Sequence, residues 1–139
     1  MRTPTLLIAD DEQTLRETLG EVFRPWGFRT FLAADGEEVL DILRAHEIHL
    51  ALLDLHMPKL SGLEAVRVAR QHKLLLPCIL ASTEFDEVVL SQARLLRIVR
   101  FLPKPFSLRQ VVETVLLTWE ENYGSFPGKS LINGLKNGE

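Results

Sequence analysis

The chain has 139 residues, of which 46% are hydrophobic and 25% are charged, a composition typical of one soluble globular domain. Its net charge of −3, without any strongly basic window, gives no electrostatic basis for direct nucleic-acid binding. The single cysteine, Cys78, excludes an internal disulfide and favours a reducing compartment, and no run has the pattern of a signal peptide or the length of a membrane span. We therefore expect a small cytoplasmic domain with no membrane partner.

Short apolar runs of strand length alternate with helical patterns along the chain. The runs, in chain order, are Leu6–Ala9, Phe28–Ala33, Leu50–Leu53, Cys78–Ala81 and Ile98–Leu102. The helical patterns are apolar stripes that start at Leu15, Val39, Leu63, Val89 and Leu108. Two of these helices begin with capping-box patterns, D-G-E-E from Asp35 and S-x-x-Q from Ser107.

Five strands that alternate with five helices predict an α/β fold with one parallel sheet and helices on both faces. The simplest topology is a doubly wound sheet with the flavodoxin-like strand order 2-1-3-4-5. We expect this domain over residues 1–121, and a tail or the start of a linker over residues 122–139, which are rich in glycine and asparagine. Ligands of such sheets bind at the carboxyl ends of the strands, so the residues that follow each run are the candidate site.

Acids, hydroxyls and one ammonium group follow the predicted strands. They are Asp10, Asp11, Asp54, Ser82, Thr83 and Lys104. Acids gathered at one edge repel one another unless a cation lies among them, and Mg²⁺ prefers carboxylate and carbonyl oxygens. One carboxylate can then act as a nucleophile toward phosphorus, while Lys104 counters the phosphate charge. The pattern predicts Mg²⁺-dependent capture of a phosphoryl group on an aspartate.

These motifs resemble those of the receiver domains of two-component response regulators, over roughly residues 4–121. The matching segments are Asp10-Asp11, D-L-H-M-P-K-L-S-G at 54–62, Ser82 and K-P-F at 104–106. The resemblance implies that Asp54 accepts a phosphoryl group from a histidine kinase or a histidine phosphotransfer protein. It also implies a signalling module that catalyses only its own phosphorylation and dephosphorylation, and not an enzyme.

The resemblance further implies the ligands of the metal ion. Asp11, Asp54 and the backbone carbonyl of His56 would hold Mg²⁺, with Asp10 acting through water. Lys104 would bind the phosphoryl oxygens, and the bond from Lys104 to the following proline is usually cis in such proteins.

The family's conformational switch carries over in the same way. Ser82 would also bind the phosphoryl oxygens, and its hydroxyl would move toward the phosphoryl group while the ring of Phe101 rotates inward. The face made by the fourth helix, the fifth strand and the fifth helix would read out this change, toward an output domain or a homodimer.

The sequence departs from the family pattern at two places. Thr83 stands where alanine or glycine is usual, and we hypothesise that it lengthens the lifetime of the phosphate. His56 and Glu84 also border the site. Arg97 and Arg100 lie in a segment that usually carries glycine, alanine and an acid, which makes the expected output face more basic and leaves its partner open.

Several alternatives remain open from the sequence. Asp10 or Asp11 can be a helix cap, Asp54 a turn residue, and Phe101 an ordinary core aromatic. A phosphoaspartate phosphatase or phosphotransferase of the haloacid-dehalogenase type also uses an aspartate and Mg²⁺, but it carries a second acid where this chain has His56. A flavodoxin-like nucleotide binder is disfavoured because no glycine-rich phosphate loop is present. The receiver can stand alone or precede an output domain.

Overall fold

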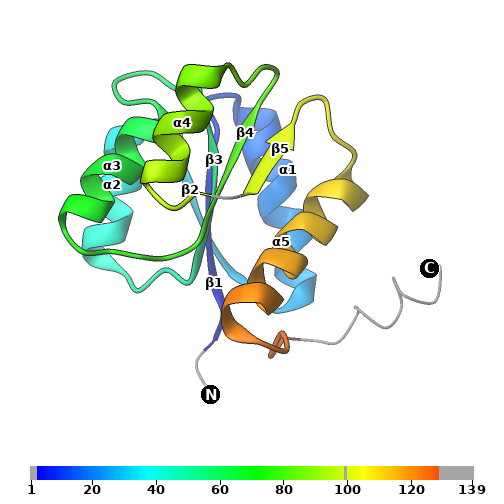
Figure 1. Ribbon diagram of the computed structural model, residues 1–139. Helices are drawn as coiled ribbons and strands as arrows, with labels where there is room; N and C mark the ends of the chain where they lie inside the picture. The colour runs from blue at the N-terminus through cyan, green and yellow to red at the C-terminus, as the bar shows by residue number, and fades with distance from the viewer. Residues whose placement is uncertain (1–2, 99, 129–139) are drawn as a thin grey trace.

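A five-stranded parallel sheet forms the centre of the protein, in a computed structural model that describes residues 3–98 and 100–128 (Figure 1). Its strands lie in the order β2-β1-β3-β4-β5, which confirms the predicted doubly wound topology. The strands are β1 (Thr5–Ala9), β2 (Arg29–Ala33), β3 (Leu50–Asp54), β4 (Cys78–Ser82) and β5 (Arg100–Pro103). Ile98, where the predicted run starts, lies before the last strand, whose first described residue is Arg100.

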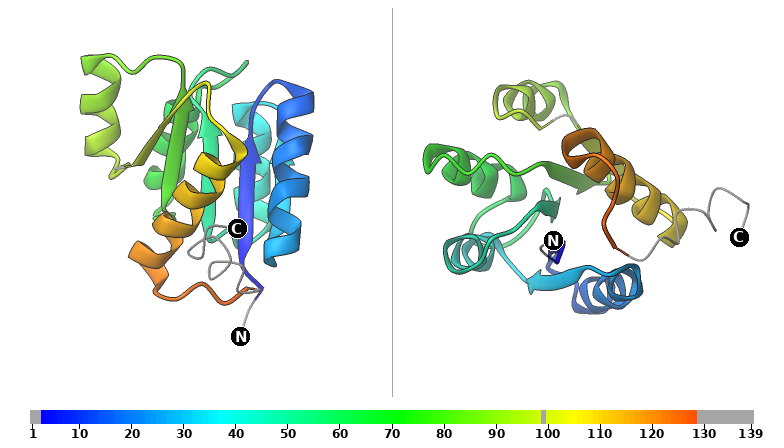
Figure 2. Two further views of the ribbon diagram at one scale, coloured as in Figure 1. Left: turned by 90° about the vertical axis from the view of Figure 1, so that its right-hand side faces the viewer. Right: turned by 90° about the horizontal axis from the view of Figure 1, so that it is seen from below.

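Helices cover both faces of the sheet, as the views in Figure 2 show. They are α1 (Gln13–Phe23), the short 3₁₀ helix η1 (Arg24–Trp26), α2 (Gly36–Ala45), α3 (Gly62–Gln71), α4 (Glu87–Leu95) and α5 (Leu108–Tyr123). Helices α1 and α5 pack on one face, and α2, α3 and α4 pack on the other. No helix in the described ranges is long and apolar enough to cross a membrane.

Alternate residues of the central strands enter two separate hydrophobic clusters. In β1, Leu6 and Ile8 face the side of α1 and α5, whereas Leu7 and Ala9 face the side of α2 and α3. All five residues of β1 are buried, and the same holds for β3 and β4. A strand that is buried on both faces needs a continuous apolar run, which explains why the sequence pattern marks these strands clearly.

Side chains cap the helices at the carboxyl edge of the sheet. Ser107 accepts a hydrogen bond from the backbone N–H of Gln110, and the Gln110 side chain accepts one from the N–H of Ser107, which confirms the predicted capping box. At α2, Asp35 accepts from the N–H of Glu38 as predicted. The Glu38 carboxylate, however, accepts from the N–H of Ala34 rather than from that of Asp35.

The segment after α5 folds back against the core. Helix α5 ends at Tyr123, and Gly124 reverses the chain with a φ of 83°, a conformation that glycine adopts readily. Phe126 is then buried, with its ring centroid 4.8 Å from that of Phe28 and 5.5 Å from that of Trp119. The first part of the expected tail therefore packs against the domain. Residues 129–139 lie outside the described part of the chain, and the domain boundary at residue 121 stays a prediction.

Candidate functional site

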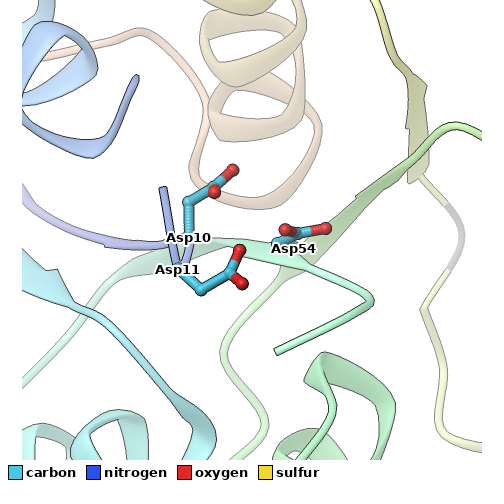
Figure 3. Close-up of side chains that lie close together, drawn as sticks. All are labelled: Asp10, Asp11 and Asp54. Carbon is cyan, nitrogen blue, oxygen red and sulfur yellow. The ribbon is translucent and has the colours of Figure 1, made fainter. Parts of the chain in front are cut away.

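Three aspartates meet at the carboxyl edge of the sheet. Asp10 and Asp11 follow β1, and Asp54 is the last residue of β3, the neighbouring strand. Each offers a carboxylate oxygen, and these oxygens all lie within 4.8 Å of one another (Figure 3). The parallel register of β1 and β3 brings together acids that are more than forty residues apart in the sequence, as the strand-end argument predicts.

Lys104 supplies the positive charge of this cluster. Its ammonium nitrogen lies 2.8 Å from Oδ2 of Asp10 and 3.3 Å from Oδ2 of Asp54. The backbone N–H of Lys104 donates to the carbonyl of Ser82, at 2.8 Å, and the bond from Lys104 to Pro105 is cis as expected. The lysine is therefore held at the end of β5 with its side chain directed at the acids.

Burial and neighbouring charges both shift the pKa values of Asp54 and Lys104. Burial raises the pKa of Asp54, and the nearby Asp10 carboxylate raises it further, while Lys104 and the backbone N–H of His56 act in the opposite direction. For Lys104, burial by itself would lower the pKa, but the hydrogen bond to Asp10 and the charges of Asp54 and Asp10 outweigh it, so the pKa is raised. The lysine thus remains an ammonium group.

The donor set fits a divalent cation. The formal charges of the three carboxylates and the ammonium group sum to −2, which a divalent cation would balance. Asp10 and Asp54 are buried, whereas Asp11 is exposed and leaves one side of the cluster open to solvent. An all-oxygen donor set with an open side suits Mg²⁺, which keeps water ligands that a phosphate group can replace.

The turn after β1 is fixed by contacts that the sequence analysis did not predict. The backbone N–H of Asp10 donates to the carbonyl of Ala33 at 3.1 Å, and its Oδ1 accepts from the N–H of Glu12 at 2.9 Å. Arg16 of α1 reaches back and donates from Nη1 to the carbonyl of Asp10, at 2.8 Å. An arginine on a helix has no sequence signal for such a role, because the contact depends on how the helix packs.

The loop after β3 rests on the start of α2. A Cβ placed on Gly36 would lie 2.3 Å from Cβ of Leu60, so this close approach requires glycine. Lys59, which has a φ of 68°, places its ammonium group 3.5 Å from Oδ2 of Asp35. The hydrogen bond from the backbone N–H of Glu38, helped by the charge of Lys59, holds the pKa of Asp35 below its usual range. The loop that carries the predicted metal-binding carbonyl is therefore fixed to a second element.

The predicted hydroxyl and the bordering residues lie around the acids in different ways. Ser82 is buried at the end of β4, where its Oγ donates to the carbonyl of Glu84 at 2.9 Å and accepts from the N–H of Glu84. Thr83 and Glu84 are exposed, as is His56, whose backbone N–H donates to Oδ1 of Asp54 at 3.4 Å. The Ser82 hydroxyl is thus engaged with the main chain of the next loop rather than with the acids.

Phe101 of β5 is partly buried and not a fully enclosed core residue. Its ring meets that of Phe85 edge to face, with centroids 5.2 Å apart. Phe85 lies in the loop after β4, three residues beyond Ser82, and was not singled out from the sequence. The two rings connect that loop to β5.

Comparison with known proteins places this arrangement in a family. The profile of the response regulator receiver domain matches residues 6–116. Response regulator RR06 of Streptococcus pneumoniae serotype 2 is 37% identical over 110 residues, which cover 79% of this chain and 50% of that protein. Transcriptional regulatory protein CpxR of Escherichia coli K12 is 32% identical over 130 residues, which cover 93% of this chain and 55% of that protein. The chain spans about half the length of these relatives.

Solved structures agree on the fold. The chemotaxis protein CheY4 of Vibrio cholerae superimposes with a TM-score of 0.78 at 22% identity, over 84% of this chain and 99% of that one. The receiver domain of Francisella response regulator 1452 gives a TM-score of 0.77 at 24% identity, over 86% and 98% of the two chains.

The haloacid-dehalogenase alternative fits these findings less well. It calls for a second acid two residues after Asp54, where this chain has His56 with an exposed side chain. The family profile covers most of the chain and includes Asp10, Asp54 and Lys104. This protein belongs to the receiver domains of two-component response regulators.

Proposed function

We propose that Asp54 is the phosphoacceptor of this receiver domain and that it takes its phosphoryl group from a phosphohistidine of a histidine kinase or a histidine phosphotransfer protein. The observation that carries the proposal is the position of Asp54 at the end of β3, 3.3 Å from the Lys104 ammonium and within 4.8 Å of the other two acids. Family membership supports the same assignment.

In the transfer step, a carboxylate oxygen of Asp54 attacks the phosphorus atom of the donor. An oxygen–phosphorus bond forms, the phosphorus–nitrogen bond to the donor imidazole breaks, and the electron pair remains on that nitrogen. Lys104 would neutralise charge on the phosphoryl oxygens. Asp11, Asp54 and the carbonyl of His56 would hold Mg²⁺, with Asp10 acting through water, and the ion would supply charge neutralisation and a template for the phosphate.

The proposed readout begins at Ser82. Its hydroxyl would exchange the main-chain carbonyl of Glu84 for a phosphoryl oxygen, which is a stronger, charge-assisted acceptor. The loop that carries Phe85 would then move with Ser82 and change the packing of the Phe101 ring. We infer that the face of α4, β5 and α5 transmits this change to an output domain or a second copy, so the protein acts as a signalling module.

The site is tested by incubating the protein with a small-molecule phosphodonor and Mg²⁺ and measuring its intact mass. We expect a gain of one phosphate, which is absent in Asp54→Asn and when EDTA removes the metal. The matched control is Asp41→Asn, an exposed aspartate of α2 that pairs with Arg44, and this variant should be phosphorylated like the parent. Equal incorporation by Asp54→Asn would refute the assignment, and folded parent protein that binds Mg²⁺ without incorporating phosphate would indicate a receiver that does not use phosphate.

We also infer a cytoplasmic location, which rests on Cys78. It is a free, buried cysteine, and burial raises the pKa of its thiol to about 11, so it is an unreactive thiol of the kind common in reducing compartments.

A further inference from the structure

The amino edge of the sheet carries a second charged region, at the end of the molecule away from the three aspartates. A cavity of about 170 Å³ lies there between the end of α3, the start of β4, the turn from α4 to β5, and the end of α5. Three arginines line it, Arg70, Arg97 and Arg100, against a single carboxylate, that of Glu121. The lining therefore holds two net positive charges in a protein whose overall charge is −3.

Arg70 is held rigidly but is not neutralised. Its guanidinium donates to three backbone carbonyls: from Nε to Leu96 at 2.8 Å, and from Nη1 to Leu74 at 2.8 Å and Leu76 at 2.9 Å. Among the described residues, the hydrogen-bond partner of its remaining nitrogen, Nη2, is the sulfur of Cys78, at 3.9 Å, which is a weak acceptor. The carbonyl groups fix the orientation of the Arg70 guanidinium but do not supply a full negative charge. Its positive charge therefore remains available to an anion.

Arg100 is paired on one side only. Its Nη2 forms an ion pair with Glu121, whereas its Nε is buried and has no hydrogen-bond partner in the described part of the protein. The ion pair with Glu121 therefore leaves part of the Arg100 guanidinium without an acceptor. Arg97 is exposed, has a φ of 63°, and forms no ion pair with any described residue.

We propose that this cavity binds a small, doubly charged anion of the phosphate class. The guanidinium group of Arg97 and the Nη2 group of Arg70 can donate charge-assisted hydrogen bonds to phosphate oxygens, and a dianion balances the two net charges of the lining. Since a water molecule takes up about 30 Å³, the cavity has room for a group with several oxygen atoms. The bound anion would link α3, the turn before β5, and α5.

This site differs from the phosphorylation site in charge and in position. The carboxyl edge is acidic and takes a phosphoryl group only with a cation, whereas the amino edge is basic and needs no metal. Anion binding here should therefore persist in EDTA and in the Asp54→Asn variant. That independence separates a failure of this proposal from a failure of the proposed phosphoacceptor function.

The test is calorimetric titration of the purified protein with inorganic phosphate and with pyrophosphate, in EDTA and at fixed ionic strength. We expect saturable binding that Arg97→Ala and Arg100→Gln each weaken about tenfold, the effect of losing a charge-assisted hydrogen bond. Glu121→Gln should strengthen binding by a few-fold, because it removes the one opposing charge, and a gain of this kind cannot come from misfolding. Arg109→Ala is the matched control, since this exposed arginine of α5 pairs with Glu113 outside the cavity.

Three results would overturn the proposal. The first is the absence of saturable binding by the folded protein. The second is binding of equal strength in Arg97→Ala and the parent. The third is binding that disappears in Lys104→Met but remains in Arg97→Ala, which would place the anion at the carboxyl edge.

Discussion

The two edges of the sheet carry opposite charges, although they are built from the same strands and helices. The carboxyl edge gathers Asp10, Asp11 and Asp54, whereas the amino edge gathers arginines around a cavity. The α-helices α1 to α5 run back from the carboxyl edge, so their N-termini lie at the acidic edge and their C-termini at the basic edge. The direction of the helices thus favours acids at one edge and guanidinium groups at the other.

The contacts at each edge follow this rule. Asp35 and Asp86 cap helix N-termini at the carboxyl edge. Arg70 binds carbonyls that follow α3 and α4 at the amino edge. The comparison indicates that the direction of the helices favours both sets of charges, and the acidic set is the one that the proposed function uses. Variants at each edge should accordingly separate stability from phosphorylation.

The largest effect is expected at the amino edge, on stability. Phe126→Ala removes a buried ring that packs on Phe28 and Trp119, and it should lower the free energy of unfolding by about 3 kcal/mol. Urea denaturation measures this change, with Leu117→Ala, at a half-exposed position of α5, as the control. Phosphate incorporation by the folded variant should be unchanged. A loss of less than 1 kcal/mol would mean that the segment after α5 does not belong to the folded core.

Lys104→Met should produce the opposite result, a large effect on phosphorylation. The variant removes the ammonium group that lies between Asp10 and Asp54, and we expect the rate of phosphate incorporation to fall about 100-fold. Intact mass followed over time with a small-molecule phosphodonor gives the rate. Lys73→Met, an exposed lysine at the other edge, is the control and should react at the parental rate. A rate within threefold of the parent would remove Lys104 from the proposed mechanism.

The fold was predictable from the sequence because the central strands are buried on both sides. Continuous apolar runs then mark β1, β3 and β4 almost to the residue. The edge strand β5 was placed too early, since Ile98 is equally apolar but precedes the strand and packs in the core beside α4. An apolar residue in the sequence indicates a buried position. Whether that position belongs to the strand or to the turn before it depends on backbone hydrogen bonding, which the sequence pattern does not show.

The candidate site was predictable to the extent that it follows strand ends. Asp10, Asp11, Asp54 and Lys104 meet because parallel strands align their carboxyl ends, which the sequence order alone implies. The supporting contacts were not predictable. Arg16 on the Asp10 carbonyl and Lys59 on Asp35 depend on the packing of α1 and α2, which has no local sequence signal.

Asp54→Asn tests how much stability the acidic cluster costs. Burial raises the pKa of Asp54 above its value in the unfolded chain, which is near 3.9. The contribution of this carboxyl group to the free energy of unfolding is therefore fully present below the unfolded pKa, and it is lost as the pH rises through the folded pKa. At pH 7 without Mg²⁺, the variant should melt about 3 °C higher than the parent, while Lys104 keeps Asp10 as its partner. The gain should vanish below pH 4. A gain that is equal at pH 7 and pH 4 would show that ionisation of Asp54 is not its source.

The smallest effect is expected at Thr83, on the lifetime of the phosphate. The residue is exposed and directly follows the buried Ser82, and the hypothesis is that its branched side chain would restrict the approach of water to a phosphoryl group on Asp54. Thr83→Ala should therefore speed loss of the phosphate about threefold, which corresponds to less than 1 kcal/mol in the barrier. The measurement is the decay of phosphorylated protein after the donor is removed, with Thr114→Ala on α5 as the control. An unchanged decay rate would refute the hypothesis that the bulk of Thr83 lengthens the lifetime of the phosphate.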